Sequence, residues 1–141
     1  MTRREFRALV DEAMALIPPE FRDAMHNIAI VIEDEPTLEQ LDDVGIEPPD
    51  TMFGLYEGTP LTDRQWSNEV PLPDKITLFQ FPIEDACDTR DDIIVEIGET
   101  LIHEIGHYFG LSEDEIEEIE DRYWHARDAG DGESRGDDED R

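Results

Sequence analysis

The chain has almost no cysteine and almost no lysine. Cys87 is the only cysteine among 141 residues, so an intrachain disulfide is impossible and a zinc site built from thiolates is excluded. No histidine lies near Cys87 in the sequence, and we therefore expect a buried or half-buried thiol rather than a nucleophile. Lys75 is the only lysine, and every other basic residue is an arginine.

Long apolar runs are also missing. No stretch approaches the roughly 18 to 20 apolar residues that a membrane span requires. The opening letters M-T-R-R-E-F-R are not followed by the uninterrupted apolar run of a secretory signal, so we expect a cytoplasmic protein. The length suits one domain with a single core, over residues 1–125. Residues 126–141 are acidic, lack an apolar stripe, and are expected to form a disordered tail.

Basic residues are few relative to acidic ones. The chain has 39 acidic and 11 basic residues, for a formal net charge of -28. This field repels nucleic-acid phosphates and anionic membranes, so we expect neither as a partner, whereas basic or neutral peptides would be attracted. The same composition is typical of a surface solvated in high salt, and both interpretations stay open. The oligomeric state is not predicted by the sequence.

The most informative stretch is residues 101–115, L-I-H-E-I-G-H-Y-F-G-L-S-E-D-E. It contains the pattern H-E-x-x-H, formed by His103, Glu104 and His107. Histidines four apart lie on one side of a helix and can bind the same metal ion. Glu104 is turned by about 100° and can reach a water on that ion. The pattern predicts two metal ligands and one general base.

A third ligand is expected beyond the turn at Gly110, because glycine readily adopts the left-handed conformation that ends a helix. Glu113 lies ten residues after His103, and a carboxylate is an ordinary zinc ligand. Asp114 and Glu117 are alternative third ligands. Two imidazoles and a carboxylate in a site open to water suit Zn²⁺.

Other interpretations of these residues remain open. Ser112 and Glu115 have the spacing of a capping box, in which Glu113 and Asp114 would be first-turn acids favoured by the helix dipole. A first-turn carboxylate can still point at a metal, so the two roles are compatible. The two histidines could also be ordinary helix residues beside a surface glutamate.

The periodicity of apolar residues predicts several helices and strands. Helices are expected over residues 3–17 and 112–124, with a long one from Thr89 or Asp91 through Phe109, and strands over residues 28–32, 52–56 and 75–81. The first strand is expected to be buried on both faces, and the other two to form a hairpin bridged by residues 63–73. Gly98 and Gly106 would allow another element to approach the long helix closely.

Several segments resemble a known family. These are R-R-E-F-R-A-L-V-D-E-A-M-A-L-I-P-P-E, G-L-Y-E-G-T-P-L-T-D-R, C-D-T-R-D-D and H-E-I-G-H-Y-F-G, within residues 1–124. They are similar to the small bacterial zincin-like metallopeptidases, or minimal zincins. The resemblance implies an α+β zincin-like fold, in which a small mixed sheet packs against the active-site helix and an N-terminal helix. It also implies zinc held by His103 and His107. The family usually has aspartate at the position of Glu113.

These observations lead to one main hypothesis and two alternatives. The main hypothesis is a zinc-dependent metallopeptidase, in which Glu104 takes the proton of a metal-activated water that attacks a peptide carbonyl. Its partner would be a peptide or protein substrate, whose identity the sequence does not specify. The alternatives are a non-catalytic metal-binding protein and an acidic module that binds a basic partner.

Overall fold

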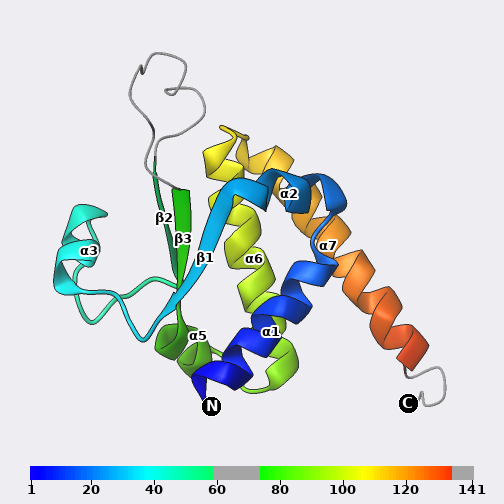
Figure 1. Cartoon of the computed structure of the whole chain (residues 1–141), viewed down its shortest axis with the longest axis horizontal. Coiled ribbons are helices and arrows are strands. Elements are labelled where there is room, and N and C mark those ends of the chain that lie inside the picture. The colour runs from blue at the N-terminus through cyan, green and yellow to red at the C-terminus, as the bar shows by residue number, and fades with distance from the viewer. Residues whose placement is uncertain (59–73, 135–141) are drawn as a thin grey trace.

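The computed structural model describes residues 1–58 and 74–134, which form helices and one small sheet (Figure 1). The elements in chain order are α1 (Arg3–Leu16), α2 (Pro19–Ala24), the 3-10 turn η1 (Met25–Asn27), β1 (Ile28–Glu33), α3 (Leu38–Asp43), β2 (Gly54–Glu57), β3 (Asp74–Phe79), α5 (Gln80–Ala86), α6 (Arg90–Tyr108) and α7 (Glu113–Ser134). The predicted α+β class is confirmed. None of the described helices is long and apolar enough to cross a bilayer.

The described strands form one mixed sheet in the order β1-β3-β2. Strand β1 runs parallel to β3, and β2 runs antiparallel to it, with Gly54 opposite Leu78 and Glu57 opposite Lys75. The predicted pairing of the second and third strands is therefore confirmed. The segment expected to bridge them, residues 63–73, lies outside the described residues.

Two details of the strands differ from expectation. Strand β1 is not buried on both faces, because it lies at a sheet edge; Ile28 and Ile32 are buried, whereas Ala29 is exposed. Strand β3 ends at Phe79 rather than at residue 81, since Gln80 already begins α5. Pro82 is consequently a first-turn helix residue, where its missing N–H costs no helical hydrogen bond, and it does not end the strand.

Helix α6 is central to the fold. It contacts α1, α5 and α7 as well as β2 and β3, and in Figure 1 it runs between the sheet and α7. Thr89 caps it by accepting a 3.0 Å hydrogen bond from the main-chain N–H of Asp92, which resolves the choice of cap left open by the sequence. The fully buried side of α6 is aliphatic and comprises Ile97, Leu101, Ile102 and Ile105. Burial of this side fixes which flank of α6 is left for polar residues.

Helix α7 packs tightly against α6 at two glycines, as the sequence predicts. A Cβ atom at Gly98 would lie 2.1 Å from Cζ of Tyr123, and one at Gly106 would lie 2.6 Å from Cδ1 of Ile116. The hydroxyl of Tyr123 also donates a 2.8 Å hydrogen bond to the main-chain oxygen of Ile94. Helices can approach this closely only where one of them carries no side chain.

The end of the last predicted helix differs from expectation. Helix α7 continues to Ser134 rather than ending at residue 124. An established helix can extend past its apolar side, because it adds one hydrogen bond for each further residue that it fixes. Residues 135–141 lie outside the described residues. The division at residue 125 between a domain and a tail stays a prediction.

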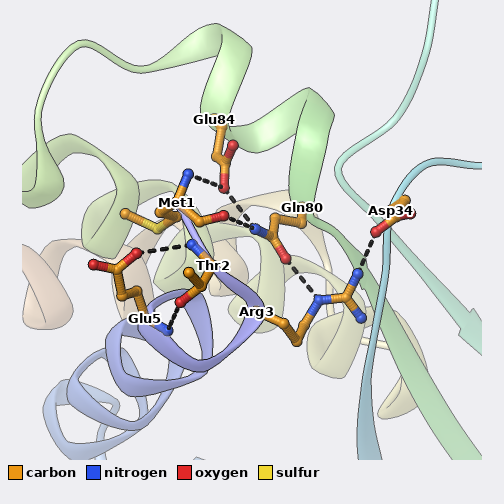
Figure 2. A network of polar contacts seen from close by, with 7 residues as sticks. All are labelled: Met1, Thr2, Arg3, Glu5, Asp34, Gln80 and Glu84. Carbon is orange, nitrogen blue, oxygen red and sulfur yellow. Dashed lines mark hydrogen bonds and ion pairs between the residues drawn. The ribbon is translucent and has the colours of Figure 1, made fainter.

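A polar network ties the start of α1 to β1 and α5 (Figure 2). Nε of Arg3 donates a 2.7 Å hydrogen bond to Oε1 of Gln80, and Nη1 donates one of 2.8 Å to the main-chain oxygen of Ile32. The same guanidinium pairs with Asp34. Gln80 is 2% exposed and donates through Nε2 to Glu84 across 2.7 Å. Its buried amide is thus satisfied, as a buried polar group must be to avoid a desolvation cost.

Candidate catalytic and metal site

Helix α6 brings the H-E-x-x-H residues to one cleft. His103, Glu104 and His107 all line a hollow of about 330 Å³ beside the start of β2. The two imidazole ring centroids are 6.3 Å apart and the ring planes are inclined at 83°. The side chains of His103 and His107 are 41% and 56% exposed, so both are accessible to solvent. The three residues therefore meet at one cleft, with both histidines accessible to solvent; their roles as metal ligands and general base stay predictions.

Glu104 faces strand β2. Its Oε1 accepts a 2.9 Å hydrogen bond from the main-chain N–H of Tyr56. Phe79 donates its N–H to the main-chain oxygen of Phe53, so the antiparallel alternation directs the main-chain groups of Gly54 and Tyr56 away from β3. Burial raises the pKa of Glu104 above its usual range, and the Tyr56 N–H and the two histidines partly oppose this effect.

The rest of the cleft is formed by β2 and by the preceding turns of α6. Gly54 lies so close to the helix that a Cβ there would be 2.5 Å from Cγ2 of Thr100. Glu96 and Glu99 line the same hollow, and neither lysine nor arginine is among its lining residues. Burial, and next the negative charge of Glu99, raise the pKa of Glu96. The cleft thus has an acidic lining beside the histidines.

The turn after α6 has the predicted form. Gly110 has a φ of 70° and the N–H of Leu111 donates a 2.9 Å hydrogen bond to the main-chain oxygen of Gly106. Ser112 and Glu115 form the capping box, with hydrogen bonds of 2.8 and 3.1 Å.

Glu113, in the first turn of α7, has Oε2 at 4.0 Å from Nε2 of His107. The capping box and the approach to the histidine therefore coexist.

Sequence analysis missed Glu120. Its Oε2 lies 2.7 Å from Nδ1 of His103, and its side chain is only 18% exposed. Burial raises the pKa of Glu120, whereas the charge of His103 lowers it. Glu120 follows Glu113 by seven residues, so both lie on one face of α7. That spacing was a signal, but it became informative only when α7 was placed against α6.

One pair of candidate donor atoms lies near the separation that a zinc ion requires. Two ligand atoms on a tetrahedral zinc are roughly 3.3 Å apart for bonds of about 2.0 Å. Nε2 of His107 and Oε2 of Glu113 are already 4.0 Å apart, and Glu113 is 78% exposed and has room to rotate. Among the described residues, no three His, Cys, Asp or Glu side chains already converge closely enough to hold an ion. The ligand set of His103, His107 and Glu113 stays a prediction, with Asp114 and Glu117 as alternatives.

An H-E-x-x-H helix beside the edge strand of a small mixed sheet is the architecture expected of a zincin-like metallopeptidase. A family model described as zincin-like metallopeptidase matches residues 25–123, which is most of the chain and includes β1, β2, β3 and α6. The chain belongs to this family. Zincin-like proteins typically bind zinc. No curated protein matches the chain.

Proposed function

We propose that the protein is a zinc-dependent peptidase in which His103 and His107 bind the metal, Glu113 completes the ligand set and Glu104 is the general base. The observation that carries this proposal is the position of Glu104. Its carboxylate is held by the N–H of Tyr56 within the cleft that both histidines line. This supports the proposal, because Glu104 could then accept a proton between the proposed metal ligands and the strand along which a peptide could lie.

A bound zinc ion would polarise the scissile carbonyl and lower the pKa of a water ligand to roughly 7. Glu104 would take a proton from the attacking water and deliver it to the departing amine. The raised pKa of Glu104 favours both transfers, because a base works best when its pKa is close to the working pH. With Oε1 engaged by Tyr56, Oε2 is the oxygen directed to the water.

The substrate that fits this cleft is an extended peptide with a basic side chain. Strand β2 lies at an edge of the sheet formed by the described strands, and Gly54, whose main-chain groups point away from β3, lines the cleft, where a peptide could add as a further strand. Glu96 and Glu99 line the same cleft, and a lysine or arginine of the peptide would offset the cost of keeping these carboxylates charged. The net charge of -28 attracts such peptides from a distance.

Metal content and hydrolysis of peptide libraries test the proposal. We expect about one zinc per chain in the wild type and in Glu104→Gln, and loss of zinc in His103→Ala. Hydrolysis should fall by about 100-fold or more in Glu104→Gln, the range typical of a lost general base. Glu118→Gln, which makes the same change on the exposed face of α7, is the matched control and should retain activity.

Other results would point elsewhere. Wild-type protein that binds no zinc after incubation with the metal would rule out the peptidase. Stoichiometric zinc without cleavage of any library would favour the non-catalytic metal-binding alternative. Alanine variants of Glu113, Asp114 and Glu117 identify the third ligand, because only the variant that lacks the true ligand should bind zinc much more weakly. Glu96→Gln should reduce cleavage of cationic peptides more than that of neutral ones.

A further inference from the structure

Glu120 is an acid in a position that the packing of α7 would otherwise make apolar. Ile116 and Tyr123 precede and follow it by one turn, and both pack into glycine positions of α6. Glu120 is therefore held on the face of α7 that meets α6, with 18% of its side chain exposed, whereas Glu113 of the same helix is 78% exposed. Removing a carboxylate from water is costly unless it gains a partner.

The partner of Glu120 is His103. Oε2 of Glu120 lies 2.7 Å from Nδ1 of His103, and the main-chain oxygen of Glu99 lies 3.3 Å from the same nitrogen. Both neighbouring atoms are hydrogen-bond acceptors, so Nδ1 of His103 must carry the hydrogen. In a neutral imidazole this leaves the lone pair on Nε2, the other ring nitrogen.

We propose that Glu120 is a positioning residue that holds His103 in the Nδ1–H tautomer, with Nε2 available to bind the metal. A hydrogen bond from a carboxylate to the second nitrogen of a ligating histidine fixes the ring orientation and makes the ligand more basic. The part of this inference that concerns metal affinity rests on the proposed function, whereas the part that concerns the tautomer does not.

The tautomer is measurable in the protein without metal. Chelator-treated, ¹⁵N-labelled full-length chain at about pH 8 gives long-range proton–nitrogen correlations. These report which nitrogen of each ring carries the hydrogen and distinguish both neutral forms from the imidazolium. We expect the Nδ1–H form for His103 in the wild type and a shift toward the Nε2–H form in Glu120→Ala. The remaining histidines, His26, His107 and His125, are internal references that should not change.

Zinc affinity, measured by competition with a chromophoric chelator, gives the second readout. Glu120→Ala should weaken zinc binding by about 10- to 100-fold, the usual effect of losing such a partner. Glu120→Gln keeps an acceptor oxygen in the same place, so it should preserve the tautomer and recover part of the affinity. Glu118→Ala removes the same charge from the exposed face of α7 and should change neither readout.

These readouts separate positioning from a structural ion pair. A structural role alone would lower the melting temperature and leave the tautomer of His103 in Glu120→Ala as in the wild type, which would overturn the inference. Zinc loss in Glu120→Ala as complete as in His103→Ala would also overturn it, because Glu120 would then be a ligand. The tautomer of His103 could change in Glu120→Ala while the wild-type chain binds no zinc. That result would support the positioning role of Glu120 and refute the proposed peptidase.

Discussion

The main-chain N–H of Tyr56 donates a 2.9 Å hydrogen bond to Oε1 of Glu104 and thereby joins the edge strand β2 to the H-E-x-x-H helix. This N–H is directed away from β3, so it takes no part in the sheet ladder. A carboxylate that accepts a main-chain hydrogen bond is stabilised in its charged form, in opposition to the burial that raises the pKa of Glu104. The orientation of the proposed base is therefore set in part by strand β2.

Removing the N–H of Tyr56 should lower the free energy of unfolding, and this loss should require the carboxylate of Glu104. Tyr56→Pro deletes the hydrogen, and proline is tolerated at this outward-facing edge position. Tyr56→Ala is the matched control, because it also loses the ring but keeps the N–H. We expect Tyr56→Pro to be less stable than Tyr56→Ala by about 1.5 to 3 kcal/mol, as for hydrogen bonds to charged groups.

Urea unfolding of metal-free protein measures the difference. In a Glu104→Ala background the gap between the two Tyr56 variants should shrink by the same amount, since the acceptor is gone. A gap that persists unchanged in that background would show that backbone strain from proline, and not the hydrogen bond, causes the loss.

Gly98 should resist the usual stabilising effect of alanine in a helix. Gly→Ala inside a helix normally adds about 1 kcal/mol of stability. Here the added Cβ would lie 2.1 Å from Cζ of Tyr123, so α7 would have to move. We expect Gly98→Ala to lower the free energy of unfolding by about 1 to 3 kcal/mol, the range for overpacking.

A double-mutant cycle with Tyr123→Leu tests this cause. The smaller leucine removes the ring atoms that clash, so Gly98→Ala should become neutral or stabilising in that background. Equal effects of Gly98→Ala in both backgrounds, measured by urea unfolding, would contradict the close contact.

The parts of the site that sequence predicted correctly are set by local signals. The Gly110 turn and the Ser112–Glu115 capping box each involve residues within about one helical turn. The position of His103 and His107 on one side of α6, with Glu104 turned by about 100°, follows from the helix period alone. Such features depend on residues that are close in the sequence, which is why one sequence is sufficient to place them.

Sequence could not place the features that depend on packing between elements. Glu120 reaches His103 because Gly98 and Gly106 let α7 approach, and neither glycine indicates which face of α7 will meet α6. The partial exposure of β1 follows from its place at the sheet edge, which its apolar run does not encode. The same limit applies to the third ligand, since acids at three candidate positions differ only in where α7 directs them.

Stability should increase as the pH falls from about 8 toward about 5, the region above the ordinary glutamate pKa. Burial raises the pKa of Glu96, Glu104 and Glu120 in the folded chain. The folded state therefore binds protons more readily than the unfolded state, and its stability falls as pH rises. Hydrogen bonds with Thr2 lower the pKa of Glu5 below the ordinary glutamate value of 4.5. Protonation of Glu5 should therefore reduce stability as the pH falls below 4.5, opposite to the trend at higher pH.

Urea unfolding of metal-free protein at constant ionic strength measures this dependence. The net charge of -28 should also make the folded chain more stable at lower pH, because protonation reduces the repulsion between its carboxylates. Glu96→Gln should therefore reduce the slope more than Glu118→Gln, which removes one charge from an exposed position. If the free energy of unfolding changed equally with pH in the two variants, net charge alone would explain the pH dependence of stability.

Cys87 should be a poor nucleophile in the folded protein. Burial, followed by the negative charges of Glu96, Asp92 and Asp88, raises the pKa of its thiol to about 11. An unfolded cysteine has a pKa of about 8.5, so at about pH 8 the folded chain carries roughly 100-fold less of the reactive thiolate. Iodoacetamide should alkylate the folded protein slower than the urea-unfolded protein by about that factor.

The pH profile of alkylation separates the raised pKa from simple blocking of access. Only thiolate reacts, so the alkylation rate of the folded chain should keep rising about tenfold per pH unit up to about pH 10. The rate for the unfolded chain should level off near about pH 9. Steric protection alone would lower the folded rate at every pH but leave the plateau where the unfolded chain has it. A folded profile that levels off near about pH 9 would therefore contradict the electrostatic effect of the carboxylates around Cys87.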